Sequence, residues 1–290
     1  KKTRENGLSP KSLLTLNCNP FASEEDDDST TMMLLLAAAA PSSSSVCSST
    51  LSTGSTITNS SATLGADGCV SGVNTTMNSD LPSWIKDNFK CSVAWVSGDY
   101  YCFKSKNLPN HASYYWIAAA AGAPLAAALP NLDGTQYTAA GTNRIGSQNF
   151  VYAIPKNPTR NTGTLSGTQA GLSSIGITRN GIAIFNNAAA PGDTLATEAT
   201  TFDAFGSHPN NQSISHHHAW VKKFSTDQSG AATTEYNNDS NLIGIALDGY
   251  AIYGSKCDNG TAATGDDTTP TLDSYHGHTA VTTHFSTSTY

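Results

Sequence analysis

The chain has 290 residues, of which 38% are hydrophobic and only 13% are charged, and its formal net charge is −7. This length suffices for one large domain or two medium domains, each with a buried core. The acidic balance without a basic cluster argues against a nucleic-acid partner. The longest apolar run, residues 32–41, is too short to span a bilayer, so we expect no transmembrane segment.

The first eighty residues differ in composition from the rest of the chain. In residues 24–45 (EEDDDSTTMMLLLAAAAPSSSS), like residues follow like in blocks, and we assign no function to this order. Residues 32–40 favour a helix, and residues 42–63 favour an extended, Ser-rich segment. We expect an N-terminal extension, or arm, over residues 1–80 and a β-rich domain over residues 81–290.

Helix and strand signals follow one another closely from about residue 80 onward. Residues 80–85 (DLPSWI) have the polar cap and early proline of a short helix. Brief β-branched and aromatic runs, separated by Gly, Asn and Pro, predict strands at residues 92–96, 100–103, 114–118 and 150–154. The pattern predicts a mainly β, sandwich-like domain with few short helices.

Six dispersed cysteines favour disulfides and an oxidising compartment, although buried free thiols are the alternative. They are Cys18, Cys47, Cys69, Cys91, Cys102 and Cys257. No CxxC pair suggests a zinc or thioredoxin-like site. Cys91 and Cys102 bracket two short apolar runs around a Gly98-Asp99 turn, so we predict a local bridge between them.

Two segments of the C-terminal half predict β-hairpins. Residues 175–186 (IGITRNGIAIFN) and 243–254 (IGIALDGYAIYG) lie 68 residues apart and align without gaps. Each carries Asn-Gly or Asp-Gly between apolar runs, and type I′ hairpin turns prefer these dipeptides because both central residues need positive φ.

Two further matches downstream, at offsets of 70 and 68 residues, predict an internal pseudo-twofold duplication. Residues 203–208 (DAFGSH) align with residues 273–278 (DSYHGH), and residues 215–218 (SHHH) with residues 283–286 (THFS). The predicted half-repeats span about residues 175–218 and 243–286.

Seven of the eight histidines fall in this duplication, together with its two aspartates. Imidazole and carboxylate suit Zn²⁺, Cu²⁺ or Mn²⁺. The candidate ligands are Asp203, His208, His216, His218, Asp273, His278 and His284. On a strand, His216 and His218 share one face and His217 points the other way. A purely structural His–Asp hydrogen-bond network is the alternative. Calcium in the acidic loop at residues 258–273 is less favoured than a solvated surface loop.

These elements resemble the YHYH-domain family, named for its Tyr-His-Tyr-His element. The resemblance covers roughly residues 105–290 and rests on NLPNH at 107–111, FVYAIP at 150–155, the two Asp-x4-His motifs and LIGIALDGYAIYG at 242–254. The name element is altered: residues 215–218 keep both histidines and neither tyrosine, and residues 283–286 keep one histidine. The resemblance implies secretion and a His-rich site, and it adds His111 to the candidate metal ligands.

We expect a secreted or cell-surface structural protein that self-assembles into a fibre or surface layer, with the N-terminal arm pairing with a neighbouring subunit. The alternative is a metalloenzyme with His111, His208, His216 and His218 around an open metal, or a module that binds metal or glycan. Four protein ligands would exclude the enzyme, whereas three ligands plus water would favour it. Acceptor sites for N-glycans occur at Asn59, Asn74, Asn211, Asn238 and Asn259.

Overall fold

The computed structural model describes residues 13–15, 43–57, 62–116, 143–159, 174–186, 188–190, 192–218, 242–254, 270–273 and 277–289. Strands predominate in these residues and the helices are short, which confirms the predicted mainly β fold. Several predicted features lie outside the described residues: the helix at 32–40, Cys18, Cys257, most of the acidic loop, Asn59, Asn238 and Asn259. Asn74 and Asn211 are exposed, as glycan acceptors must be.

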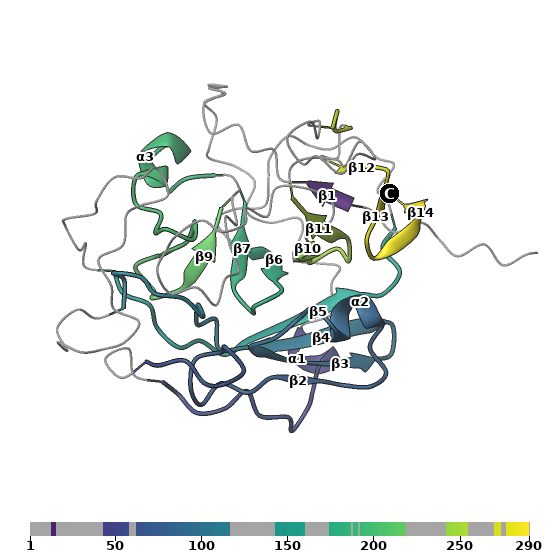
Figure 1. Cartoon of the computed structure of the whole chain (residues 1–290), viewed down its shortest axis with the longest axis horizontal. Coiled ribbons are helices and arrows are strands. Elements are labelled where there is room, and N and C mark those ends of the chain that lie inside the picture. Colours follow the sequence, from purple (N-terminus) through teal and green to yellow (C-terminus); the bar gives the residue numbers. More distant parts are fainter. Residues whose placement is uncertain are drawn as a thin grey trace, which may run out of the picture.

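One sheet has four strands in the order β2-β3-β4-β5 (Figure 1). Their bounds are Thr76–Met77 for β2, Ser92–Ser97 for β3, Tyr100–Ser105 for β4 and Phe150–Pro155 for β5. Strands β3, β4 and β5 are antiparallel neighbours and confirm three of the predicted strands, with Gly98 at positive φ in the β3–β4 turn. Helix α2, Ser83–Lys86, confirms the short helix predicted from residues 80–85.

The strand predicted at residues 114–118 is wrong over its described part. Tyr114, Tyr115 and Trp116 lie in a turn, and all three side chains are buried. The hydroxyl groups of Tyr114 and Tyr115 both donate to the carbonyl oxygen of Thr201, at 3.1 and 2.7 Å. The aromatic run therefore packs into a core cluster instead of pairing with a strand.

A second sheet has eight strands in the order β12-β1-β11-β10-β6-β7-β9-β8. Their bounds in chain order are Leu13–Thr15 (β1), Ser174–Thr178 (β6), Ala183–Phe185 (β7), His208–Pro209 (β8), Ser215–His217 (β9), Leu242–Ala246 (β10), Ala251–Tyr253 (β11) and Gly277–His278 (β12). The antiparallel pairs β6–β7 and β10–β11 confirm both predicted hairpins. Their turns are not of the predicted type I′, because Gly181 and Gly249 have positive φ whereas the preceding Asn180 and Asp248 do not.

The two hairpins meet in the centre of this sheet through the antiparallel pair β6–β10. Ile177 pairs with Ile245 there, and the glycines on either side, Gly176 and Gly244, approach the partner strand closely. A Cβ atom at Gly244 would lie 2.2 Å from the carbonyl oxygen of Ile177, so no side chain fits at this position. The duplication that would relate the hairpins stays a prediction.

Residues 283–286, which align with residues 215–218, lie in a hairpin outside the eight-stranded sheet. Thr283 and His284 lie in the turn of a separate hairpin, between β13 (Ala280–Thr282) and β14 (Phe285–Thr289). The position beside β11 that corresponds to β9 beside β7 is taken by β1, which runs parallel to β11 and antiparallel to β12.

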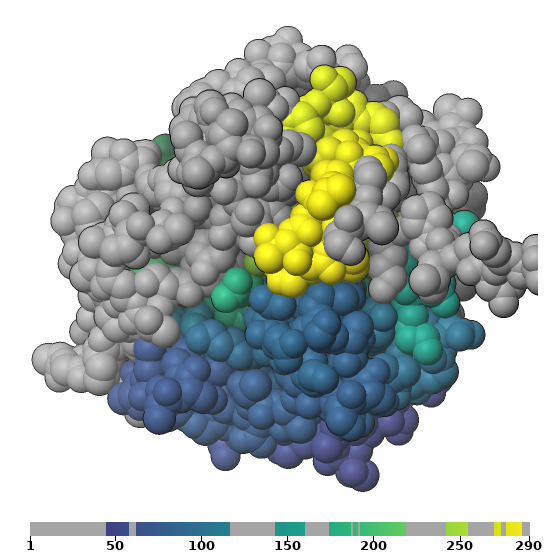
Figure 2. Space-filling model, turned by 45° about the vertical axis from the view of Figure 1, so that its right-hand side comes forward, coloured from purple at the N-terminus to yellow at the C-terminus, as the bar shows by residue number. Residues whose placement is uncertain are grey.

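The two large sheets pack against each other through one hydrophobic cluster, which gives the predicted sandwich-like arrangement. Buried members include Phe103 and Ile154 from the four-stranded sheet and Ile177 and Ile245 from the eight-stranded sheet. Figure 2 shows the yellow C-terminal strands lying against the blue N-terminal part, where the rings of Trp84 and Phe285 are 5.6 Å apart.

Two disulfides, Cys47–Cys102 and Cys69–Cys91, tie residues 43–80 to this body, so the predicted Cys91–Cys102 bridge is wrong. In the β3–β4 register Cys102 pairs with Trp95, while Cys91 precedes β3 and lies beyond the end of the pairing. Helix α1, Ser43–Val46, immediately precedes Cys47. The domain boundary at residue 80 stays a prediction, although buried residues on both sides of it share these contacts.

Candidate metal centre

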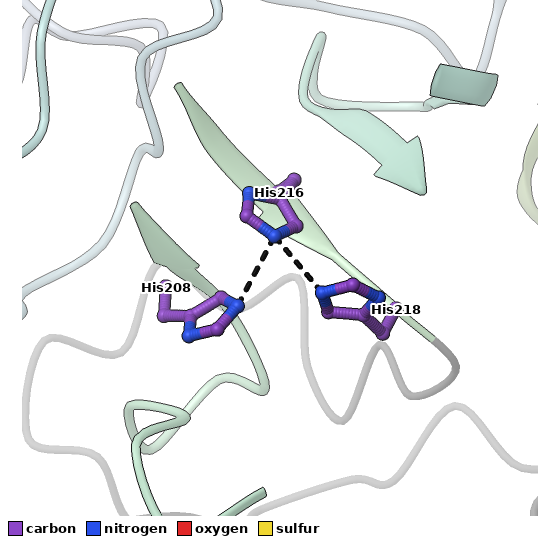
Figure 3. A group of neighbouring side chains, drawn as sticks. All are labelled: His208, His216 and His218. Carbon is purple, nitrogen blue, oxygen red and sulfur yellow. Dashed lines mark hydrogen bonds between the residues drawn. The ribbon is translucent and has the colours of Figure 1, made fainter. Parts of the chain in front are cut away.

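Three histidines meet at the β8 edge of the eight-stranded sheet. His208 of β8 pairs with His216 of β9 across an antiparallel ladder. His218 comes two residues after His216, and the alternation of side chains puts both rings on one face. Figure 3 shows the three rings turned toward one another. The Nε2 atom of His216 lies 3.1 Å from Nε2 of His208 and 3.0 Å from Nε2 of His218.

The loop between β8 and β9 is shaped by Asn210. Its side-chain oxygen accepts hydrogen bonds from the backbone N–H groups of Gln212 and Ile214, at 2.9 and 3.0 Å. Asn suits such turns because its short side chain bonds to the backbone a few residues ahead. This turn sets the register of β8 on β9, and that register brings His208 opposite His216.

Hydrogen bonds at Nδ1 fix the tautomers of His216 and His218. Nδ1 of His216 lies 2.9 Å from the carbonyl oxygen of Ile214, and Nδ1 of His218 lies 2.7 Å from that of Asn186. A carbonyl oxygen can only accept a hydrogen bond, so both Nδ1 atoms carry the proton. The two Nε2 atoms are therefore left as acceptors when the rings are neutral.

His208 also carries its proton on Nδ1. Its Nδ1 atom lies 2.7 Å from the hydroxyl oxygen of Thr201. That hydroxyl donates its own proton to the carbonyl oxygen of Glu198, at 2.7 Å. Thr201 therefore accepts from His208, as a partner that orients a metal-binding histidine does.

The close contacts between the Nε2 atoms join acceptor to acceptor. Burial lowers the pKa of His208 to about 3, and burial with the nearby His208 and His218 lowers the pKa of His216 well below 6.5. Both rings are thus neutral at neutral pH, and no proton bridges their Nε2 atoms. A shared cation would turn the repulsion into attraction, because two nitrogens that each lie about 2.1 Å from one ion are about 3.0–3.4 Å apart.

Aromatic rings enclose the three histidines. Phe185 stacks on His216 with ring centroids 4.0 Å apart, and Phe202 meets His208 edge-on at 4.9 Å. Phe202 also stacks on His218 at 5.9 Å. These contacts restrict the imidazoles to one orientation and keep water away from the centre, which strengthens electrostatic interactions within it.

Glu198 is a further, mostly buried group of this region, and it was not among the residues predicted from the sequence. Its Oε2 atom lies 3.1 Å from Nε2 of His218, and the side chain is 12% exposed. It comes from α3, Leu195–Ala199, a five-residue helix whose first turn is capped by the side chain of Thr194. The signal that could have indicated Glu198 is the helix start at Asp193-Thr194, but this stretch lies outside the aligned motifs.

Two of the predicted ligands, His111 and Asp203, lie together but apart from the three histidines. Asp203 shapes its own turn, since Oδ1 accepts from the backbone N–H groups of Phe205 and Ser207, at 3.0 and 3.1 Å. The ring of His111 stacks on Phe205 at 4.0 Å, and its Nδ1 atom lies 3.8 Å from Asp203 Oδ2. His217 faces this side, with Nδ1 2.9 Å from the carbonyl oxygen of Gly206, as strand alternation predicts.

The other predicted ligands, Asp273, His278 and His284, lie in the second of the two predicted half-repeats. Asp273 repeats the turn of Asp203, because Oδ1 accepts from the backbone N–H of Gly277 at 3.2 Å. His284 bonds through Nδ1 to the hydroxyl of Tyr253 at 2.7 Å. Among the described residues, His208, His216 and His218 form the one group whose ligand atoms all lie within 4.8 Å of one another.

The family model described as YHYH protein matches residues 151–270. Residues 151–270 thus match the YHYH domain that the sequence motifs predict. No curated protein and no solved structure matches the chain. The matched region of the YHYH domain contains His208, His216, His218 and Glu198, whereas His111 precedes it and Asp273 follows it.

Proposed function

We propose that this protein is an extracellular metal-binding protein whose YHYH domain holds one divalent transition-metal ion between His208, His216 and His218. The observation that carries the proposal is the convergence of three Nε2 atoms whose Nδ1 partners fix them as acceptors. A structural hydrogen-bond network would need protons between these nitrogens, and burial opposes the protonation of His208 and His216. Three imidazoles suit Zn²⁺ or Cu²⁺ well, and Mn²⁺ less well.

The extracellular location is supported by the covalent cross-links of the domain. Disulfides form and persist in oxidising compartments and are rare where thiols are kept reduced. The described residues contain two, and both are buried. No helix in the described residues is long and apolar enough to cross a membrane.

Zinc binding tests the proposed centre. Chelator-treated protein should bind one equivalent of Zn²⁺ in calorimetry, and His216→Ala and His218→Ala should each weaken binding at least about 100-fold, because removing a ligand costs more than disturbing its supporting partners. His217→Ala is the matched control, since this ring is equally buried but points to the opposite face. Equal zinc binding by all four proteins would reject the metal centre and leave a structural network.

A second candidate function, self-assembly through the N-terminal arm, is favoured by the position of β1. This strand is inserted between β11 and β12 (Figure 1), so it completes the sheet from a distant part of the sequence. Residues 16–42 separate β1 from α1. A connection of this length is long enough for β1 to reach a neighbouring copy. Exchange of such a strand links subunits at little energetic cost.

Disruption of β1 tests this assembly. We expect the wild-type protein to form oligomers or filaments at high concentration, and Leu14→Pro to convert them to monomers, because proline cannot donate to a paired neighbour. Leu14→Val is the control that keeps the backbone donor. Light scattering and electron microscopy give the readout. Dispersed monomers of wild type, or unchanged filaments of Leu14→Pro, would contradict assembly through this strand.

A further inference from the structure

We infer that Glu198 is the fourth protein ligand of the ion, so that the centre binds metal through three imidazole nitrogens and one carboxylate oxygen. The inference rests on the proposed function, because it requires that the three histidines hold a metal. It adds a ligand from α3, an element outside the motifs that predict the histidines.

The two oxygens of Glu198 have different surroundings. Oε1 accepts a hydrogen bond from the backbone N–H of Ala190 at 3.1 Å, which orients the carboxylate. Oε2 is buried, has no hydrogen-bond partner among the described residues, and lies 3.1 Å from Nε2 of His218. Burying a carboxylate oxygen without a hydrogen-bond donor costs free energy, and a bound cation at this position would offset that cost.

Glu198 and His218 repeat the contact that the histidines make with one another. The proton of His218 is on Nδ1, so in the neutral ring Nε2 meets Glu198 Oε2 as one acceptor meets another. Four acceptor atoms thus form a chain with steps of 3.1, 3.0 and 3.1 Å. In order, they are Nε2 of His208, His216 and His218 and Oε2 of Glu198. One ion bound to all four would explain the whole chain.

Charge balance favours a carboxylate over a further neutral ligand. A divalent ion held by three neutral imidazoles among phenylalanine rings keeps two positive charges in a buried place, at a large desolvation cost. Glu198 brings one negative charge into the same place, beside Nε2 of His218. The carboxylate would therefore offset part of the charge of the ion, and the ion would offset the charge of the carboxylate.

Binding requires a small movement of the carboxylate. The three histidine nitrogens lie mutually within 4.8 Å, whereas Glu198 stands beside them on the His218 side. A rotation about the side-chain torsions of Glu198 would be needed to bring Oε2 onto the ion. Four protein ligands then close a tetrahedral site, and a closed site holds its ion for structure or storage, whereas a catalytic site keeps one position open.

Zinc affinity and cobalt spectroscopy test the role of Glu198. The variant is Glu198→Gln, which keeps the shape and the acceptor for Ala190 while removing the charge. The control is Asp193→Asn, the same change of charge at an exposed position of the same segment. We expect Glu198→Gln to weaken Zn²⁺ binding by at least about tenfold and to alter the visible absorption of the Co²⁺-loaded protein, with Asp193→Asn unchanged in both.

The outcomes separate this inference from the proposed function. If Glu198→Gln binds Zn²⁺ as the wild type does and gives the same Co²⁺ spectrum, while His216→Ala loses zinc, the fourth ligand is wrong and the histidine centre stands. If His216→Ala also retains its zinc, the metal centre itself is rejected. An unchanged far-ultraviolet circular dichroism spectrum of Glu198→Gln excludes unfolding as the cause of a lost affinity.

Discussion

Replacing Cys47 and Cys102 by alanine should lower the free energy of unfolding by about 4 kcal/mol, and replacing Cys69 and Cys91 by about 3 kcal/mol. The bridges close loops with sequence separations of 55 and 22 residues, and a longer loop loses more entropy in the unfolded chain when it is cross-linked. Removing both bridges together should lower the free energy of unfolding by less than the sum of the two separate losses, because the shorter loop lies inside the longer one.

These losses are large because residues 43–57 and 62–80 have little regular structure of their own. Their paired elements are the two-residue strand β2 and isolated bridges such as Gly54 with Val73. Each disulfide instead joins a buried cysteine of this segment to a buried cysteine at or beside the β3–β4 hairpin. The segment therefore owes its attachment to cross-links more than to backbone pairing.

Urea unfolding of the two paired-alanine variants provides the measurement, with circular dichroism as the probe. Paired replacement avoids the free thiol that a single substitution would leave. The control is a Cys18→Ala and Cys257→Ala double variant, in which both described bridges are retained. A loss below about 1 kcal/mol for either paired variant would show that its bridge is not formed in solution.

The elements that the sequence predicts correctly are those with local causes. Asn-Gly and Asp-Gly each place a glycine at positive φ in a turn, so the hairpins β6–β7 and β10–β11 follow from the sequence, although the turn type does not. Strand alternation likewise places His216 and His218 together and His217 on the other face. In these cases each side chain and its immediate neighbours determine the geometry.

The features that the sequence does not predict depend on contacts between distant residues. The cysteine pairing follows from where residues 43–80 pack, and no spacing rule encodes that packing. The aromatic run at 114–116 has the composition of a strand, but its side chains are buried and two of its hydroxyl groups bond to Thr201. Glu198 enters the site from a helix too short to leave a periodic pattern.

Asn107 links the two strands that position the histidine centre, and its replacement by leucine should lower the free energy of unfolding by roughly 2–6 kcal/mol. Its Nδ2 group donates to the carbonyl oxygen of Ser215 in β9, and its Oδ1 atom accepts from the backbone N–H of Ala183 in β7, both at 2.8 Å. The side chain is fully buried, so leucine would leave a donor and an acceptor unpaired, each at a cost of about 1–3 kcal/mol.

The same substitution should weaken zinc binding. Ser215 immediately precedes His216 in β9, and β7 and β9 share a short parallel ladder in which Ala183 pairs with His216. Loss of the link lets β9 move relative to β7, and the supporting partners of metal ligands are typically worth about 10–100-fold in affinity. Asn107 also has a positive φ of 54°, which Asn tolerates better than Leu and which adds to the loss of stability.

Two further variants separate the role of Asn107 from a general effect of losing an asparagine. Asn107→Asp keeps an acceptor for Ala183 and loses the donor to Ser215, so both its stability and its zinc affinity should fall between those of wild type and Asn107→Leu. Asn74→Ala removes an exposed side chain that donates one hydrogen bond, to the carbonyl oxygen of Ser52, and should change stability by no more than about 1 kcal/mol. Wild-type stability together with wild-type zinc affinity in Asn107→Leu would show that the position of β9 is set by the Asn210 turn and the phenylalanine contacts alone.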